Sequence, residues 1–202
     1  SVNSNNSIVF YPFSGPDFEF AQAFYPEADE YILAGLEKAG SFHSLLFSNA
    51  EPVDSFIQSA QKYFYFSDRL GFFRTLDMEK QFDKTGVVDI IALYIKRTGA
   101  EIGSSQLYYW DINKGILSAC DSNTIPNVCS FTFRFPSGRV SNLFYFSKDL
   151  SDIGLNKDSL WLDWVKQRAS GKKMFSLVKS ASYLMQSSCF NNVRNFILTY
   201  SD

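Results

Sequence analysis

The chain has 202 residues, a length typical of one domain. Hydrophobic residues make up 46% of it and charged residues 20%, which excludes a disordered chain and indicates a globular protein with a buried core. The 19 basic and 21 acidic residues give a net charge of −2, which argues against a nucleic-acid-binding or membrane-surface protein that works through a basic face.

The N-terminal part predicts a strand, a helix and a second strand. Residues 1–7 are expected to form a flexible end, and residues 8–13 a short apolar strand. Pro16 suits the first helical position, because the backbone N–H that proline lacks would be unpaired there, and Gly15 then falls at the N-cap. The second strand is expected to run to about Leu36.

The next segments predict helices. Residues 52–64 have aromatic and small residues at helical spacing, and the charged stretch that follows reads as a helix or turn closed by Gly86. Residues 87–97 read as a buried helix that Gly99 ends. Their β-branched content leaves a strand as the alternative.

Antiparallel strands follow, and then helices. Two strands are expected to join at 113–115, and a hairpin is expected to turn at 136–138, where aromatic and polar residues alternate on both sides. Helices are expected from Asp158 or Ser159, over 174–186 and over 190–200. The fold class is therefore α/β, one domain over 8–202: a mixed sheet with a βαβ start (a Rossmann-like half), an antiparallel meander in the middle and C-terminal helices.

The residue types offer little support for most kinds of catalytic site. The one histidine, His43, would have to serve any Ser-His or Cys-His site, and no G-x-S-x-G turn is present to expose a serine. No metal site is predicted. The weak candidates are Asp149 and Asp152, which could hold a hard cation or could cap the short helix that follows them.

The three cysteines leave two alternatives open. Cys120 and Cys129 flank a polar loop that a disulfide could close, or they are two free buried thiols. Cys189, in or before the last helix, is expected to pack against its neighbours.

The turn Ser14, Gly15 and Pro16 is the best candidate for a ligand site. In folds that bind dinucleotides or S-adenosylmethionine, a glycine-containing turn follows the first strand, and an acid at the end of the second strand binds the ribose. Gly15 and Glu37 have that placement, and Asp17 would face the amino group of the ligand. The turn holds one glycine, and Pro16 removes a backbone N–H, so a pyrophosphate is disfavoured and S-adenosylmethionine fits better. The alternative is a capped helix without a ligand.

The stretch YPFSGPDFEFAQAFYPEADEYILAGLEKAG resembles a group of uncharacterised bacterial proteins. The resemblance extends to FYFSKDLSDIGL and to KSASYLMQSSCFNNVRNFIL. It implies no activity. Members of the group are often exported or lipoprotein-like and continue beyond the point that matches Asp202, which together with the cysteine pair favours a location outside the cytoplasm.

Two functions are therefore expected. The first is a non-catalytic binding or interaction protein whose partner is an unknown small molecule or protein. Aromatic residues make up 17% of the chain, so an aromatic surface could take part, although such residues also fill cores and strands. The alternative is an S-adenosylmethionine-dependent methyltransferase-like enzyme using Gly15 and Glu37. No nucleic acid is expected as a partner, and no apolar run approaches the length of a transmembrane segment.

Overall fold

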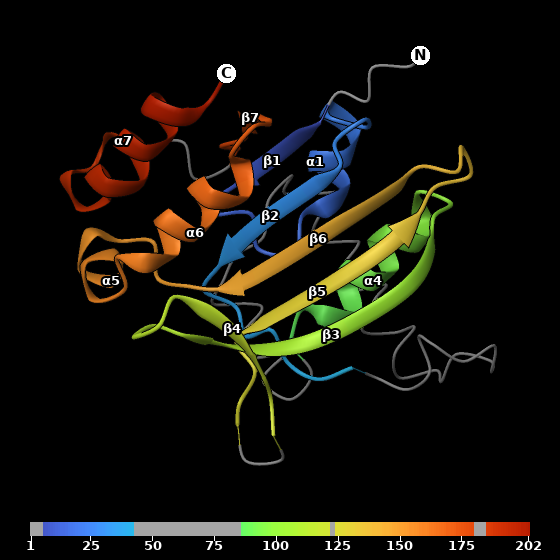
Figure 1. Ribbon diagram of the computed structural model, residues 1–202, viewed down its shortest axis with the longest axis horizontal. Coiled ribbons are helices and arrows are strands. Elements are labelled where there is room, and N and C mark those ends of the chain that lie inside the picture. The colour runs from blue at the N-terminus through green and yellow to red at the C-terminus, as the bar shows by residue number, and fades with distance from the viewer. Residues whose placement is uncertain (1–5, 43–85, 122–123, 180–184) are drawn as a thin grey trace.

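The computed structural model describes residues 6–42, 86–121, 124–179 and 185–202 (Figure 1). The predictions for His43, for the helix over 52–64 and for the charged segment before Gly86 lie outside the described residues. The described elements are β1 (Ser7–Tyr11), α1 (Phe18–Phe24), β2 (Glu30–Gly35), α4 (Val88–Arg97), β3 (Glu101–Asp111), β4 (Ile116–Ala119), β5 (Val128–Arg134), β6 (Val140–Ser147), α5 (Asp152–Lys157), α6 (Leu160–Ala169), β7 (Lys173–Ser176), the 3-10 turn η3 (Ser188–Phe190) and α7 (Asn191–Tyr200).

The strands form one mixed sheet in the order β4-β3-β5-β6-β2-β1-β7. Neighbours among β7, β1, β2 and β6 are parallel, whereas β5, β3 and β4 continue the sheet in antiparallel pairs. The predicted fold class is confirmed: the chain starts with a strand, a helix and a parallel strand, has an antiparallel middle and ends in helices. The helix over 87–97 and the turns at 113–115 and 136–138 are also confirmed.

Each face of the sheet is covered by its own helices, and the side chains of the strands alternate between them. In β1, Val9 and Tyr11 pack toward α1 and α4, whereas Ile8 and Phe10 pack toward α5, α6 and α7. Figure 1 shows α6 crossing one face of the sheet while α4 lies behind the other. Most of the largest fully buried side chains are aromatic, so aromatic residues build much of the core.

Two predictions near the N-terminus are wrong in detail. Ser7 belongs to β1 and is buried, so it is not part of a flexible end. The N-cap of α1 is Asp17, whose carboxylate accepts a hydrogen bond from the backbone N–H of Phe20, whereas Gly15 lies in the preceding turn with φ of 52°. A carboxylate makes a good N-cap because it pairs with an otherwise unsatisfied N–H, and glycine tolerates positive φ.

The prediction of a helix over 174–186 is wrong for its first part. Lys173–Ser176 form the strand β7, which pairs in parallel with β1. On the other side of β7, the backbone N–H of Met174 donates to the Asp202 carboxylate at 2.9 Å, and the N–H of Asp202 donates to the Met174 carbonyl at 2.8 Å. The last predicted helix is confirmed as α7, with Val193 and Phe196 buried.

Candidate functional site

The topology indicates where a ligand site should lie. The carboxyl ends of β1, β2 and β6 meet at one edge of the sheet. From there the chain leaves β1 for α1 on one face and leaves β6 for α5 on the other. In open α/β sheets, ligands bind outside the carboxyl ends of strands whose connections diverge in this way.

The structure brings Gly15 and Glu37 together at this edge, on the face covered by α1. A Cβ atom on Gly15 would lie 3.4 Å from Glu37 Oε2, so the carboxylate lies directly against the turn. The Tyr145 hydroxyl donates to the Glu37 carbonyl at 2.8 Å and lies 3.3 Å from Oε2. Burial, followed by the neighbouring Glu37 charge, raises the pKa of Tyr145, which keeps this phenol a hydrogen-bond donor.

Ser14 and Asp17 hold the turn in place. The Ser14 hydroxyl accepts a hydrogen bond from the N–H of Ala34 at 3.1 Å, which ties the turn to β2. The Asp17 carboxylate caps α1, accepts from the Tyr11 hydroxyl at 3.2 Å and pairs with the Lys179 amine at 3.0 Å. These partners account for both residues by structural roles, so neither needs a ligand to explain it.

Asp149 and Asp152 have separate partners. Asp149 Oδ1 accepts from the backbone N–H of Ser151 at 2.9 Å, and Ser151 itself caps α5. Asp152 accepts from the backbone N–H groups of Asn191 at 3.2 Å and Asn192 at 2.8 Å, so it links α5 to the start of α7. Within the described residues, no three His, Cys, Asp or Glu side chains gather as a metal site would require.

The cysteines are free thiols in the structure, so the candidate disulfide between Cys120 and Cys129 is not formed. Cys129 is fully buried on the β5 face that packs against α4, and burial raises its pKa. Cys120 is partly exposed. Cys189 lies just before α7 as expected, but it is exposed, so the packing role predicted for it is wrong.

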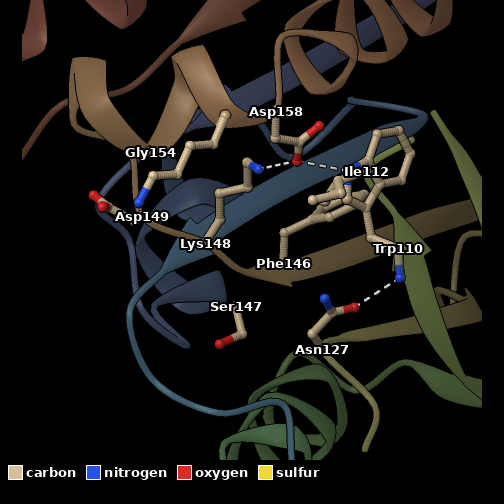
Figure 2. A pocket seen from close by; sticks show the side chains of 10 residues that line it. Trp110, Ile112, Asn127, Phe146, Ser147, Lys148, Asp149, Gly154 and Asp158 are labelled. Carbon is tan, nitrogen blue, oxygen red and sulfur yellow. Dashed lines mark hydrogen bonds and ion pairs between the residues drawn. The ribbon is translucent and has the colours of Figure 1, made fainter. Parts of the chain in front are cut away.

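A cavity of about 320 Å³ opens on the other face, beside the carboxyl ends of β6 and β3. Figure 2 shows its lining, to which β3, β6, α5 and the adjoining loops contribute. The volume lies at the lower end of the range of small-molecule sites. The lining residues are Trp110, Ile112, Asn127, Phe146, Ser147, Lys148, Asp149, Gly154, Lys157 and Asp158.

A buried ion pair forms one wall of this cavity. Asp158, between α5 and α6, accepts through Oδ2 from the Trp110 indole N–H at 2.7 Å and pairs through the same oxygen with the Lys148 amine (Figure 2). The Lys148 side chain is 10% exposed and that of Asp158 3%. Charges this deeply buried persist only when they are paired, so Lys148 and Asp158 depend on each other.

Two polar atoms beside this ion pair have no partner. Among the described residues, the buried side-chain nitrogen and oxygen atoms without a hydrogen bond are Asp158 Oδ1 and Trp161 Nε1. Asp158 lines the cavity, whereas Trp161 does not line it and lies behind the ion pair, with its ring centre 5.7 Å from the Lys148 amine. Native proteins leave few such atoms unsatisfied, and where they do, a functional reason is worth seeking.

The rest of the lining offers hydrogen-bond donors and apolar surface. Asn127 Oδ1 accepts from the backbone N–H of Trp110 at 2.8 Å, which fixes the amide, and Figure 2 shows its nitrogen turned toward the cavity. Ile112 contributes exposed apolar surface at the rim, whereas the Ser147 hydroxyl is turned away from the cavity (Figure 2). Lys157, on the exposed rim, makes no ion pair with any residue that the structure describes.

No pattern in the sequence predicted this cavity. Trp110 and Asp158 are 48 residues apart and Lys148 and Asp158 are 10 apart, and no motif joins them. The signal that was present is the position of Lys148 and Asp149 directly after an alternating strand, where the carboxyl edge of the sheet places functional side chains.

Comparisons with protein-family models, with curated proteins and with solved structures found no match. None of the helices in the described ranges is long and apolar enough to cross a membrane.

Proposed function

We propose that the protein is a non-catalytic binding protein and that the cavity at the ends of β6 and β3 holds its small-molecule ligand. The observation that carries this proposal is the coincidence of three features: a cavity of ligand size, a buried ion pair in its wall and an unsatisfied carboxylate oxygen, Asp158 Oδ1, in that pair. Pockets of this kind, apolar with a few convergent polar groups, are where small molecules bind.

The lining supports binding better than catalysis. None of the residues that line the cavity is a histidine or a cysteine, and within the described part of the chain the Ser147 hydroxyl has no hydrogen-bonded base to activate it. The buried Asp158 carboxylate is engaged by Lys148 and Trp110, so it is poorly placed to move a proton. The resemblance to exported bacterial proteins supports a location outside the cytoplasm, which cell fractionation would test.

Ligand-observed NMR with a panel of small polar fragments tests the proposal. Ile112→Trp enlarges a side chain at the rim and narrows the cavity, and Val140→Trp is the matched control, because Val140 is a similarly exposed apolar residue at the other end of β6. We expect fragments that bind the unmodified protein and V140W but bind I112W weakly or not at all, with both variants folded. Binding that is unchanged in I112W, or a panel without any binder, would refute the site.

A second candidate is the methyltransferase-like enzyme, favoured by the contact of Glu37 with Gly15. S-adenosylmethionine at about 100 times its Kd should stabilise the protein by about 2.7 kcal/mol, a rise in melting temperature of roughly 5–10 °C. The rise should disappear in Glu37→Gln and persist in Glu101→Gln, whose side chain is exposed on β3. No rise with the unmodified protein would exclude this candidate.

A further inference from the structure

We infer that the ligand of the cavity is a small zwitterion of the α-amino-acid type, with an apolar side chain. This inference rests on the proposed function, because it names the ligand of the same site. The first argument is the balance of charge around the cavity, which is lined by Lys148, Lys157, Asp149 and Asp158.

The internal ion pair cancels one charge of each sign. Lys148 and Asp158 are bound to each other, and their side chains are nearly inaccessible. One cation and one anion are left on the rim, Lys157 and Asp149, both exposed. They do not lie within ion-pair distance of each other, since no ion pair joins them. A simple anion would be attracted by Lys157 and repelled by Asp149, whereas a ligand that carries both charges can pair with both.

The hydrogen-bonding groups agree with this division. The Asn127 amide nitrogen is turned into the cavity, so it can donate to a carboxylate near Lys157. Toward the residues that the structure describes, Asp149 uses only Oδ1, on the N–H of Ser151, which leaves Oδ2 to accept from an ammonium group.

The apolar part of the lining accounts for the rest of the ligand. Ile112 stands at the rim with 42% of its surface exposed, whereas Trp110 and Phe146, whose ring centroids lie 5.9 Å apart, are almost completely buried. Covering the exposed surface of Ile112 with an apolar side chain gains free energy. The cavity volume of about 320 Å³ can accommodate a single amino acid.

Three related probes test the inference by isothermal titration calorimetry: L-phenylalanine, 3-phenylpropionate, which lacks the ammonium, and 2-phenylethylamine, which lacks the carboxylate. We expect L-phenylalanine to bind best. Because the rim charges are exposed, each should contribute about a two- to fivefold change in Kd at low salt and less at high salt.

Variants that remove one rim charge test which residue pairs with which charged group of the probes. Lys157→Gln should weaken the binding of L-phenylalanine and 3-phenylpropionate but not that of 2-phenylethylamine, and Asp149→Asn should weaken the binding of the two probes that carry an ammonium but not that of 3-phenylpropionate. Lys173→Gln, on an exposed side chain of β7, is the control and should change none of them.

The outcomes separate the inference from the proposed function. Neutral or singly charged fragments that bind in the cavity while L-phenylalanine binds no better than its truncated relatives would overturn the inference and leave the binding function standing. A cavity that takes up no molecule in the NMR experiment would overturn both.

Discussion

Replacing Lys148 by methionine should destabilise the protein strongly, because it leaves a buried carboxylate without its cation. Methionine keeps the length and apolar stem of lysine but lacks the charge. The Asp158 side chain is only 3% exposed and would retain the Trp110 indole as its hydrogen-bond donor. Removing one partner of a buried ion pair destabilises by about 3–5 kcal/mol. For a chain of this length, that lowers the melting temperature by roughly 6–20 °C.

Urea unfolding followed by tryptophan fluorescence measures this effect. Lys157→Met is the matched control: Lys157 lines the same cavity but is exposed and makes no ion pair with the described residues, so the free energy of unfolding should change by less than about 0.5 kcal/mol. Adding Asp158→Asn to Lys148→Met removes the stranded charge while an amide oxygen still accepts from Trp110, so the double variant should be more stable than Lys148→Met alone.

The reasoning would be refuted if Lys148→Met were no more destabilising than Lys157→Met. It would also be refuted if Asp158→Asn lowered the free energy of unfolding as much in the Lys148→Met background as in the unmodified protein. Either result would mean that the pair behaves as a solvated surface contact.

Two further predictions concern the close packing around Gly35 and the buried thiol and phenol of Cys129 and Tyr145. Gly35→Ala would place a Cβ 3.0 Å from the backbone N and Cα of Gly15, which cannot swing aside as the Glu37 carboxylate can, and it should lower the free energy of unfolding by about 1–3 kcal/mol in urea melts. A Cβ on Gly103 meets only ordinary contact at 3.6 Å, so Gly103→Ala should be tolerated. Burial raises the pKa of both Cys129 and Tyr145 in the folded state, so above the unfolded values of about 8.5 and 10 the folded protein holds more protons than the unfolded chain. The free energy of unfolding should therefore fall with rising pH by up to about 1.4 kcal/mol per pH unit for each group; Tyr145→Phe should flatten this fall above pH 10, and a curve that stays level from pH 7 to 11 would contradict the assignment.

Local chemistry made the hairpins and the first βα unit predictable. In β5, Phe131 and Phe133 alternate with polar residues, and the turn at 136–138 ends the strand, so both signals lie within a few neighbouring residues. The strand β7 could not be found in this way. Lys173–Ser176 carry apolar residues at a spacing that also suits a helix, and their strand form depends on β1, which lies far away in the sequence.

The two candidate sites also differ in how far the sequence could predict them. Glu37 could be placed against Gly15 from the sequence, because adjacent parallel strands bring their carboxyl ends to one edge. The cavity could not, since Trp110, Lys148 and Asp158 come from β3, β6 and the α5–α6 link, and only the folded sheet gathers them. No local motif marks any of the three residues as part of a site.

The contact between β7 and Asp202 has a consequence for self-association. An outer strand with free N–H and carbonyl groups is a template on which another molecule can add a strand. Here the outward N–H and carbonyl of Met174 are both occupied by Asp202, and the hydroxyls of Ser176 and Ser201 meet at 2.5 Å. A short stretch after α7 thus shields this border of the sheet, and Asp202→Ala, which removes the acceptor for Met174, would begin to expose it to strand addition by a second copy.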